Sequence, residues 1–222
     1  MSDLRPKYVT FDCYGTLTWF QVNDVTRRLL GGRLPAERME AFLKDFNWYR
    51  FDEVLGPWKP YVDVIKSSLE RTCRRHGIRF EEAESQALYE AVPTWGPHPD
   101  VPEPLKRVAR SYPLVILSNA SDDQIMRNVE LLQAPFHKVC TAQQAQAYKP
   151  RMRAFEYMFD VLGCGPEDVL HVSASYRYDI IPAYGLGIRH KLYVNRGYEP
   201  SIPYYEAHET TTIEGLAKLL GV

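Results

Sequence analysis

The hydrophobic pattern changes twice along the chain and divides the sequence into three parts. Residues 8–11 form an apolar, β-branched and aromatic run that ends at Asp12 and a Gly turn, which predicts a buried strand. From about residue 22 to residue 92, apolar positions recur at three- and four-residue spacing among many charges. This periodicity predicts helices, and no strand-like run interrupts them.

Helix signals place three elements in this middle part. One helix begins near Pro35, because proline suits a first helical turn, and another follows Pro60 and ends near Gly77. A third is expected over about residues 80–92. The Pro-rich stretch 93–99 predicts a stiff connector rather than a regular element.

Beyond this connector, strand and helix patterns alternate. Strands are expected at 113–119, 138–141, 169–172 and 191–194, with a helix opened at 121–124 by a capping-box pattern and another helix at 151–162. Such alternation predicts a parallel sheet with right-handed crossovers. The expected fold class is therefore α/β. A Rossmann-like parallel sheet core comprises residues 1–17 and 98–222, and an α-helical cap domain, residues 18–97, is inserted after the first strand.

Composition narrows the range of partners. The chain has 222 residues, 45% of them hydrophobic, and 27 Lys and Arg against 28 Asp and Glu give a net charge of −1. With so small a net charge, no overall electrostatic field attracts the protein to nucleic acid or to an anionic membrane, so a small molecule is the expected partner. The four cysteines show no metal-binding or redox spacing and are expected to be reduced and buried. Without an apolar signal core or a run of about 18 apolar residues, a cytoplasmic location is expected.

Polar residues gather where the predicted strands end. Open α/β sheets bind ligands beyond the carboxyl ends of their strands, so Asp12 is the expected reaction centre. The alternative is a turn or cap aspartate at a strand terminus. The other candidates near strand ends are Thr16, Ser118, Asn119, Lys149, Ser173, Ser175 and Asp179.

Four segments together resemble the haloacid dehalogenase superfamily. Residues 11–17, 117–120, 148–150 and 171–179 look like its four motifs, in order and at suitable strand ends. The resemblance covers nearly the whole chain, because this superfamily also inserts a helical cap between its first and second motifs.

Two departures separate the chain from the phosphatases of that superfamily. Those enzymes carry a second Asp two residues after the nucleophile, where this chain has Tyr14, and they place a magnesium-binding acid near 173–175, which here is Ser-Ala-Ser. A hard cation needs several oxygen ligands, preferably anionic. The pattern instead resembles the metal-independent branch of the L-2-haloacid dehalogenases, which implies no metal and no cofactor.

The resemblance implies a two-step mechanism on a short 2-substituted carboxylic acid, with water as co-substrate. Asp12 attacks C2 in line with the leaving group and forms an ester that water then cleaves, so that configuration at C2 inverts. Lys149 would keep the pKa of Asp12 low, and Asp179 would pair with Lys149 and position or deprotonate the water. The alternative for Lys149 and Asp179 is a structural ion pair.

Neighbouring polar groups would complete the catalytic set. Ser118 and the backbone amides of 13–15, including those of Cys13 and Tyr14, could bind the substrate carboxylate as an anion nest. Thr16 and Asn119 would orient Asp12. Ser173 and Ser175 either contact Asp12 or the water, or bond to their own backbone, and Ser118 and Thr16 are alternatively turn or cap residues. His171 is expected to be a core or strand-edge histidine rather than a base.

The predicted cap is expected to govern substrate choice. Trp48, Phe51 and Trp58 could roof the site and exclude water, or form a helix-pair core; Arg50 could bind a leaving anion, or cover the surface. Glu40 aligns with the halide-binding Arg of typical family members. An anionic Glu40 favours an amine leaving group, as in relatives that open the ring of azetidine-2-carboxylate.

Four functions therefore stay open from sequence. An (S)-2-haloacid dehalogenase comes first and an azetidine-2-carboxylate hydrolase second, followed by a phosphatase with an unusual metal site and a non-catalytic binding module. The aromatic insertion could also supply a homodimer interface.

Overall fold

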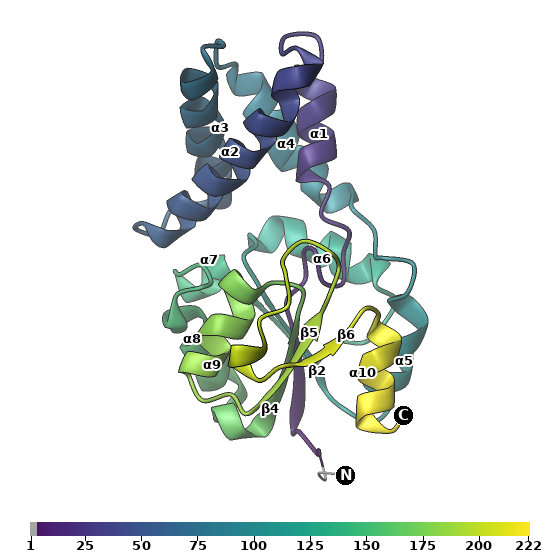
Figure 1. Ribbon diagram of the computed structural model, residues 1–222. Helices are drawn as coiled ribbons and strands as arrows, with labels where there is room; N and C mark the ends of the chain where they lie inside the picture. Colours follow the sequence, from purple (N-terminus) through teal and green to yellow (C-terminus); the bar gives the residue numbers. More distant parts are fainter. Residues whose placement is uncertain (1–3) are drawn as a thin grey trace. The chain divides into compact units, whose positions relative to one another are not determined.

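The computed structural model describes residues 4–222, and within them six parallel strands form one sheet in the order β3-β2-β1-β4-β5-β6. The first strand lies in the middle of the sheet, between β2 and β4 (Figure 1). The α/β class and the parallel sheet predicted from sequence are confirmed. The strands are β1 Tyr8–Phe11, β2 Leu114–Ser118, β3 Lys138–Thr141, β4 Val169–Ser173, β5 His190–Val194 and β6 His208–Thr210.

Helices cover both faces of this sheet, because the strands alternate their side chains between two apolar clusters. One cluster joins Phe11 and Val172 to α5, α6 and α10, and the other joins Val115 and Leu117 to α8 and α9. These elements are α5 Pro102–Ala109, α6 Asp122–Leu131, α7 Ala142–Ala145, α8 Met152–Leu162, η2 Pro166–Asp168, η3 Tyr176–Ile180, α9 Ile181–Gly185, η4 Pro203–Tyr205 and α10 Ile213–Leu220.

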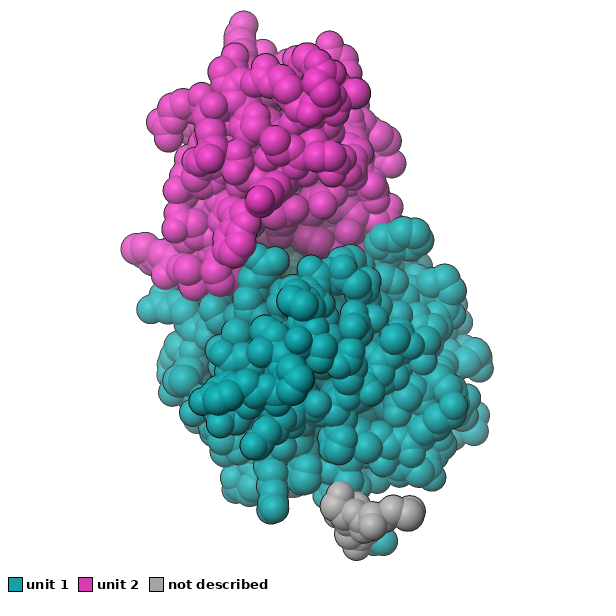
Figure 2. Space-filling view, viewed as in Figure 1, with its two compact units in different colours: residues 1–19, 96–222 teal, residues 20–95 magenta. Residues whose placement is uncertain are grey.

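A separate helical unit interrupts the chain after β1. The described chain divides into a core unit, residues up to 19 together with 96–222, and a helical unit, residues 20–95 (Figure 2). These bounds differ by two residues at each junction from the predicted 18–97 insertion. The helical unit contains α1 Val22–Leu30, α2 Ala36–Leu55, α3 Tyr61–His76, α4 Glu82–Ala91 and the short η1 Val92–Thr94.

The helix ends in this unit follow the proline and glycine signals. Pro35 immediately precedes α2, Pro60 immediately precedes α3, and Gly77 ends α3 in the left-handed conformation at φ +66°. Glycine adopts this conformation without a side-chain clash, which is why the sequence located this boundary well.

Several local expectations were wrong. No strand was expected at β6, whose three residues form no apolar run, and η1 overlaps the start of the stretch 93–99 that was expected to be irregular. Ser121 makes no capping bond to the backbone of α6, because its hydroxyl binds the side chain of Gln124 at 3.1 Å. Three of the cysteines are buried free thiols as expected, but Cys164 is partly exposed.

Across the described residues, no helix has an apolar stretch of the length and purity that a bilayer crossing requires.

The packing predicts a clear contrast on α10. Leu216 is fully buried against the sheet, so Leu216→Ala should lower the free energy of unfolding by about 2–5 kcal/mol through lost burial and a cavity. Lys218→Ala, on the exposed side of the same helix, should change it by less than about 0.5 kcal/mol. Urea denaturation measures both, and equal effects would contradict this assignment of the core.

Candidate active site

Three adjacent strands bring the predicted site residues together in the core unit. Asp12 follows β1 directly, Ser118 is the last residue of β2 and Ser173 is the last residue of β4. Because β1 lies between β2 and β4 and all three run parallel, their carboxyl ends meet at one edge. Asp12 therefore stands at the centre of this edge.

A single ammonium group joins two buried carboxylates. Lys149 Nζ donates to Asp12 Oδ1 at 2.9 Å and to Asp179 Oδ1 at 2.7 Å. Lys149 and Asp179 are almost wholly buried, and Asp12 is 8% exposed. The three residues lie far apart in the sequence, so the fold alone makes this cluster.

The charges of the cluster depend on one another. The pKa of Asp12 is raised by burial and not kept low as expected from sequence, although Lys149 and Thr16 oppose that rise. Burial would also raise the pKa of Asp179, but the Lys149 ammonium and the hydrogen bond from His171 outweigh it and leave that pKa lowered. For Lys149, burial favours the neutral amine, yet the two carboxylates raise its pKa. The lysine is therefore a protonated ammonium.

Thr16 holds the second oxygen of Asp12. Its hydroxyl donates to Asp12 Oδ2 at 2.6 Å and accepts from the backbone N–H of Ala174 at 2.8 Å. Hydrogen bonds to both oxygens fix the carboxylate plane. This contact agrees with the orienting role expected of Thr16.

The turn after Asp12 lacks part of the expected anion nest. Gly15 adopts φ +93°, and its N–H donates to Thr18 O at 2.8 Å, so this amide is not available to a substrate. The Cys13 thiol is buried, with Sγ 3.6 Å from Thr18 Oγ1, and burial raises its pKa to about 12. The Tyr14 hydroxyl donates to Asn128 at 2.8 Å. The side chains of Cys13 and Tyr14 thus bind the protein itself.

Asn119 does not orient Asp12 as predicted. Its Nδ2 donates to the carbonyl of Lys149 at 2.9 Å, and its Oδ1 accepts from the N–H of the same residue at 2.6 Å. An amide side chain that pairs with both polar groups of one residue fixes that backbone strongly. Asn119 therefore positions the lysine, and through it both carboxylates.

The serines of the site divide into two kinds. Ser118 Oγ is buried and, among residues 4–222, has no hydrogen-bond partner. A buried orphan hydroxyl is costly unless a ligand completes it. Ser173 accepts from the N–H of Ser175 at 3.0 Å, and Ser175 accepts from Tyr178 N–H at 3.2 Å. Both serines thus accept from nearby backbone N–H groups, and their roles in the reaction stay predictions.

Two residues of this network were missed in the sequence. The carboxylate of Glu199 accepts from Ser175 Oγ and from the N–H of Tyr176, and so holds the first turn of η3, which carries Asp179. Nothing in the sequence around Glu199 signals this distant contact. His171 Nε2 lies 3.0 Å from Asp179 Oδ1. The sequence did contain one signal for His171, which is a polar residue within an otherwise apolar strand.

The donor set does not fit a magnesium ion. Asp12 Oδ1 already faces an ammonium, Asp12 Oδ2 faces a hydroxyl, and the nearest second carboxylate shares the same ammonium. A divalent cation beside Lys149 would be repelled, and the 173–175 segment supplies no acid. Among residues 4–222, no group of three or more His, Cys, Asp or Glu is arranged to hold a metal ion.

The predicted substrate residues of the helical unit make contacts within that unit. Arg50 stacks over the ring of Phe20 at 4.8 Å and donates to Asn47 at 3.0 Å. Trp48 is about half exposed and packs edge-on against Phe51, with ring centroids 6.0 Å apart. The carboxylate of Glu40 accepts from Arg27 at 2.7 Å, so it is not an unpaired anion.

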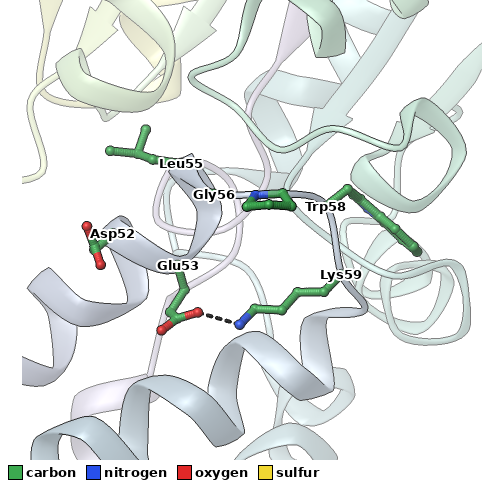
Figure 3. Close-up of a pocket in the computed structure, with 7 residues that line it drawn as sticks. Asp52, Glu53, Leu55, Gly56, Trp58 and Lys59 are labelled. Carbon is green, nitrogen blue, oxygen red and sulfur yellow. Dashed lines mark hydrogen bonds and ion pairs between the residues drawn. The ribbon is translucent and has the colours of Figure 1, made fainter.

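Trp58 lines a hollow of about 580 Å³ between the end of α2 and the start of α3 (Figure 3). The ion pair of Glu53 with Lys59 spans this hollow, and Arg71 donates to Glu53 at 2.6 Å. The charged groups are thus satisfied by each other. The indole N–H of Trp58 is buried and, in the described part of the chain, has no hydrogen-bond partner.

Comparison with known proteins now places the chain in a family. The haloacid dehalogenase-like hydrolase family matches residues 6–187, and the chain belongs to it. The (S)-2-haloacid dehalogenase of Xanthobacter autotrophicus is 29% identical over 176 residues, which are 76% of this chain and 68% of the relative.

Solved structures share the fold. The L-2-haloacid dehalogenase of Xanthobacter autotrophicus with chloropropionic acid covalently bound has a TM-score of 0.78 and 20% identity, covering 97% of this chain and 98% of that one. The HAD-hydrolase YfnB of Bacillus subtilis, bound to magnesium, has a TM-score of 0.83 and 16% identity, covering 99% and 100%. The fold alone therefore does not decide the chemistry, and the site residues must.

The cluster predicts an unusual response to pH. Lys149→Met leaves two buried carboxylates without their cation and should cost about 3–5 kcal/mol of stability at neutral pH. Without the ammonium, the pKa of Asp12 rises further and the pKa of Asp179 is no longer held down, so the folded variant binds more protons and its stability recovers as pH falls. Denaturant titrations from pH 8 to pH 5 measure this. A loss that stays constant with pH would contradict it.

Proposed function

We propose that this protein is a metal-independent hydrolase that displaces a leaving group from C2 of a short 2-substituted carboxylic acid, with an (S)-2-haloacid as its substrate class. The observation that carries the proposal is the Lys149 ammonium held between Asp12 and Asp179. It supplies positive charge next to a buried carboxylate nucleophile from a side chain of the protein itself.

In the first step, Asp12 attacks the substrate. A lone pair of a carboxylate oxygen forms a bond to C2 while the bond from C2 to the halide breaks, and the halide leaves with that bonding pair. The product is an ester of Asp12, and in-line attack inverts C2. Thr16 and Lys149 hold the attacking group in one orientation, which lowers the entropic part of the barrier.

Ser118 is the proposed anchor for the substrate carboxylate. Its buried hydroxyl has an unused donor within the described chain, and it stands at the end of the strand next to β1. A carboxylate that accepts this hydrogen bond would satisfy it. Placing the acid group there would present C2, the adjacent carbon, to Asp12.

In the second step, water cleaves the ester. Asp179 Oδ2 is buried and, across residues 4–222, has no hydrogen-bond partner, whereas Oδ1 binds Lys149 and His171. We assign Oδ2 as the base that takes one proton from water as the water oxygen attacks Cγ of Asp12. Collapse restores the Asp12 carboxylate and releases a 2-hydroxy acid that keeps the second proton, while the first passes to solvent.

The competing phosphatase function finds less support. Tyr14 occupies the position of the superfamily's general acid, and its hydroxyl is already donated to Asn128. Transfer of a phosphoryl group also needs compensation of charge that this donor set cannot gain from magnesium. The haloacid class is supported by the curated relative from Xanthobacter autotrophicus, which acts on (S)-2-haloacids by its name.

The ring-opening alternative was based on an anionic Glu40. Because Arg27 neutralises this carboxylate, the reason to prefer an amine leaving group is weaker. The expected roles of Trp48, Arg50, Phe51, Trp58 and Glu40 in substrate choice, the cytoplasmic location and the homodimer stay predictions.

The ester mechanism predicts where solvent oxygen goes. In a single turnover with excess enzyme in ¹⁸O-water, the label should enter the Asp12 carboxyl group, because water attacks Cγ and not C2. Mass spectrometry of the peptide containing Asp12 measures this. Label that appears in the hydroxy acid during the first turnover would show direct attack of water on the substrate.

A substrate panel separates the alternatives. L-2-chloropropionate should be hydrolysed without added metal and in the presence of a chelator, whereas Asp12→Ala should reduce turnover by at least about 10⁴-fold. The matched control Asp24→Ala, an exposed residue of α1, should retain activity. Turnover of azetidine-2-carboxylate alone would favour ring opening, and phosphate release that requires magnesium would favour a phosphatase.

A further inference from the structure

A buried histidine contacts the Asp179 carboxylate, at the same oxygen that binds Lys149. His171 lies in the middle of β4 with no exposed surface, and its Nε2 is 3.0 Å from Asp179 Oδ1. The edge of its ring packs against Phe155, with centroids 5.3 Å apart. The sequence predicted a core or strand-edge histidine here, with no part in the chemistry.

The second ring nitrogen of His171 contacts a threonine of the neighbouring strand. Thr10 pairs with His171 across β1 and β4, and its hydroxyl lies 2.8 Å from Nδ1 and 3.4 Å from the carbonyl of Leu170. An ionised carboxylate can only accept, so Nε2 carries the proton of its contact with Asp179. That proton points at Asp179 Oδ1, so the histidine donates to the carboxylate.

The two oxygens of Asp179 consequently have different tasks. Oδ1 accepts from both Lys149 and His171, which hold it from two elements, while Oδ2 has no partner among the described residues. Without His171, rotation about the Cβ–Cγ bond of Asp179 could exchange its two oxygens or change the direction in which the free lone pair of Oδ2 points.

We infer that His171 is the positioning residue for the hydrolytic half of the reaction: it fixes Asp179 so that Oδ2 faces the water that cleaves the Asp12 ester. The inference rests on the proposed function. It separates the two half-reactions, because ester formation uses Asp12, Thr16 and Lys149 and needs no base, whereas ester hydrolysis needs an oriented Asp179.

His171→Phe tests this by removing the donor with a ring of similar size. With L-2-chloropropionate, adduct formation on Asp12 should stay within about threefold of wild type, and adduct hydrolysis should slow by at least about tenfold. Rapid quench followed by intact-protein mass spectrometry gives both rates on the same sample. The adduct should therefore accumulate in the variant.

Two further variants make the result specific. His171→Gln retains a side-chain N–H and should restore most of the hydrolysis rate. His208→Phe, the same substitution at an exposed histidine of β6, should leave both rates unchanged.

Other outcomes overturn the inference. If His171→Phe slows both half-reactions alike, or neither, or if His171→Gln is as slow as His171→Phe, the histidine has a structural role only. If wild-type enzyme forms no adduct with any 2-haloacid, the proposed function fails first, and this inference fails with it.

Discussion

The candidate active site depends on one positive charge held between two negative charges inside the protein. Burial penalises each of these three charges, and their mutual attraction opposes that penalty only when the geometry is well defined. Lys149 satisfies the condition because both carboxylates accept from its ammonium within 3 Å, at 2.9 and 2.7 Å. The remaining features of the site serve to keep this group in place.

Each member of the cluster is held from outside it. Asn119 binds the backbone of Lys149, Thr16 fixes the orientation of Asp12, and Glu199 holds the turn that carries Asp179. These contacts come from the residue after β2, from the turn after β1 and from the segment after β5. A parallel sheet brings such distant segments to one edge, which explains why this fold can build a charged site from residues scattered through the sequence.

Much of the fold could be predicted because its signals are local. The apolar runs of β1, β2 and β4 and the proline and glycine limits of α2 and α3 are all readable in a few consecutive residues. The strand β6 was missed because three polar residues at a sheet edge bury too little surface to leave a pattern.

The site was predicted less completely, because the spacing of residues in the sequence does not identify which side chains contact each other. The ends of the strands identified Asp12, Ser118, Lys149 and Asp179. The actual partners of Asn119 and Ser175 depend on where Lys149 and Glu199 arrive in space, 30 and 24 residues away. His171 shows the same limit, since its importance comes from its contacts with Asp179 and with Thr10 on a neighbouring strand.

The same fold occurs with different bound groups. The Bacillus subtilis hydrolase that shares it was solved bound to magnesium, and in this chain the Lys149 ammonium faces Asp12. The arrangement of the strands by itself therefore does not fix which charged group accompanies Asp12.

The most direct test of this account is the ¹³C resonance of the Asp12 carboxyl carbon in protein labelled at aspartate, assigned with Asp12→Asn and followed during magnesium addition. The account predicts the chemical shift of an ionised carboxylate at pH 7, unchanged by millimolar magnesium. A resonance that moves and saturates with magnesium would contradict it, because the magnesium ion would then bind the Asp12 carboxylate.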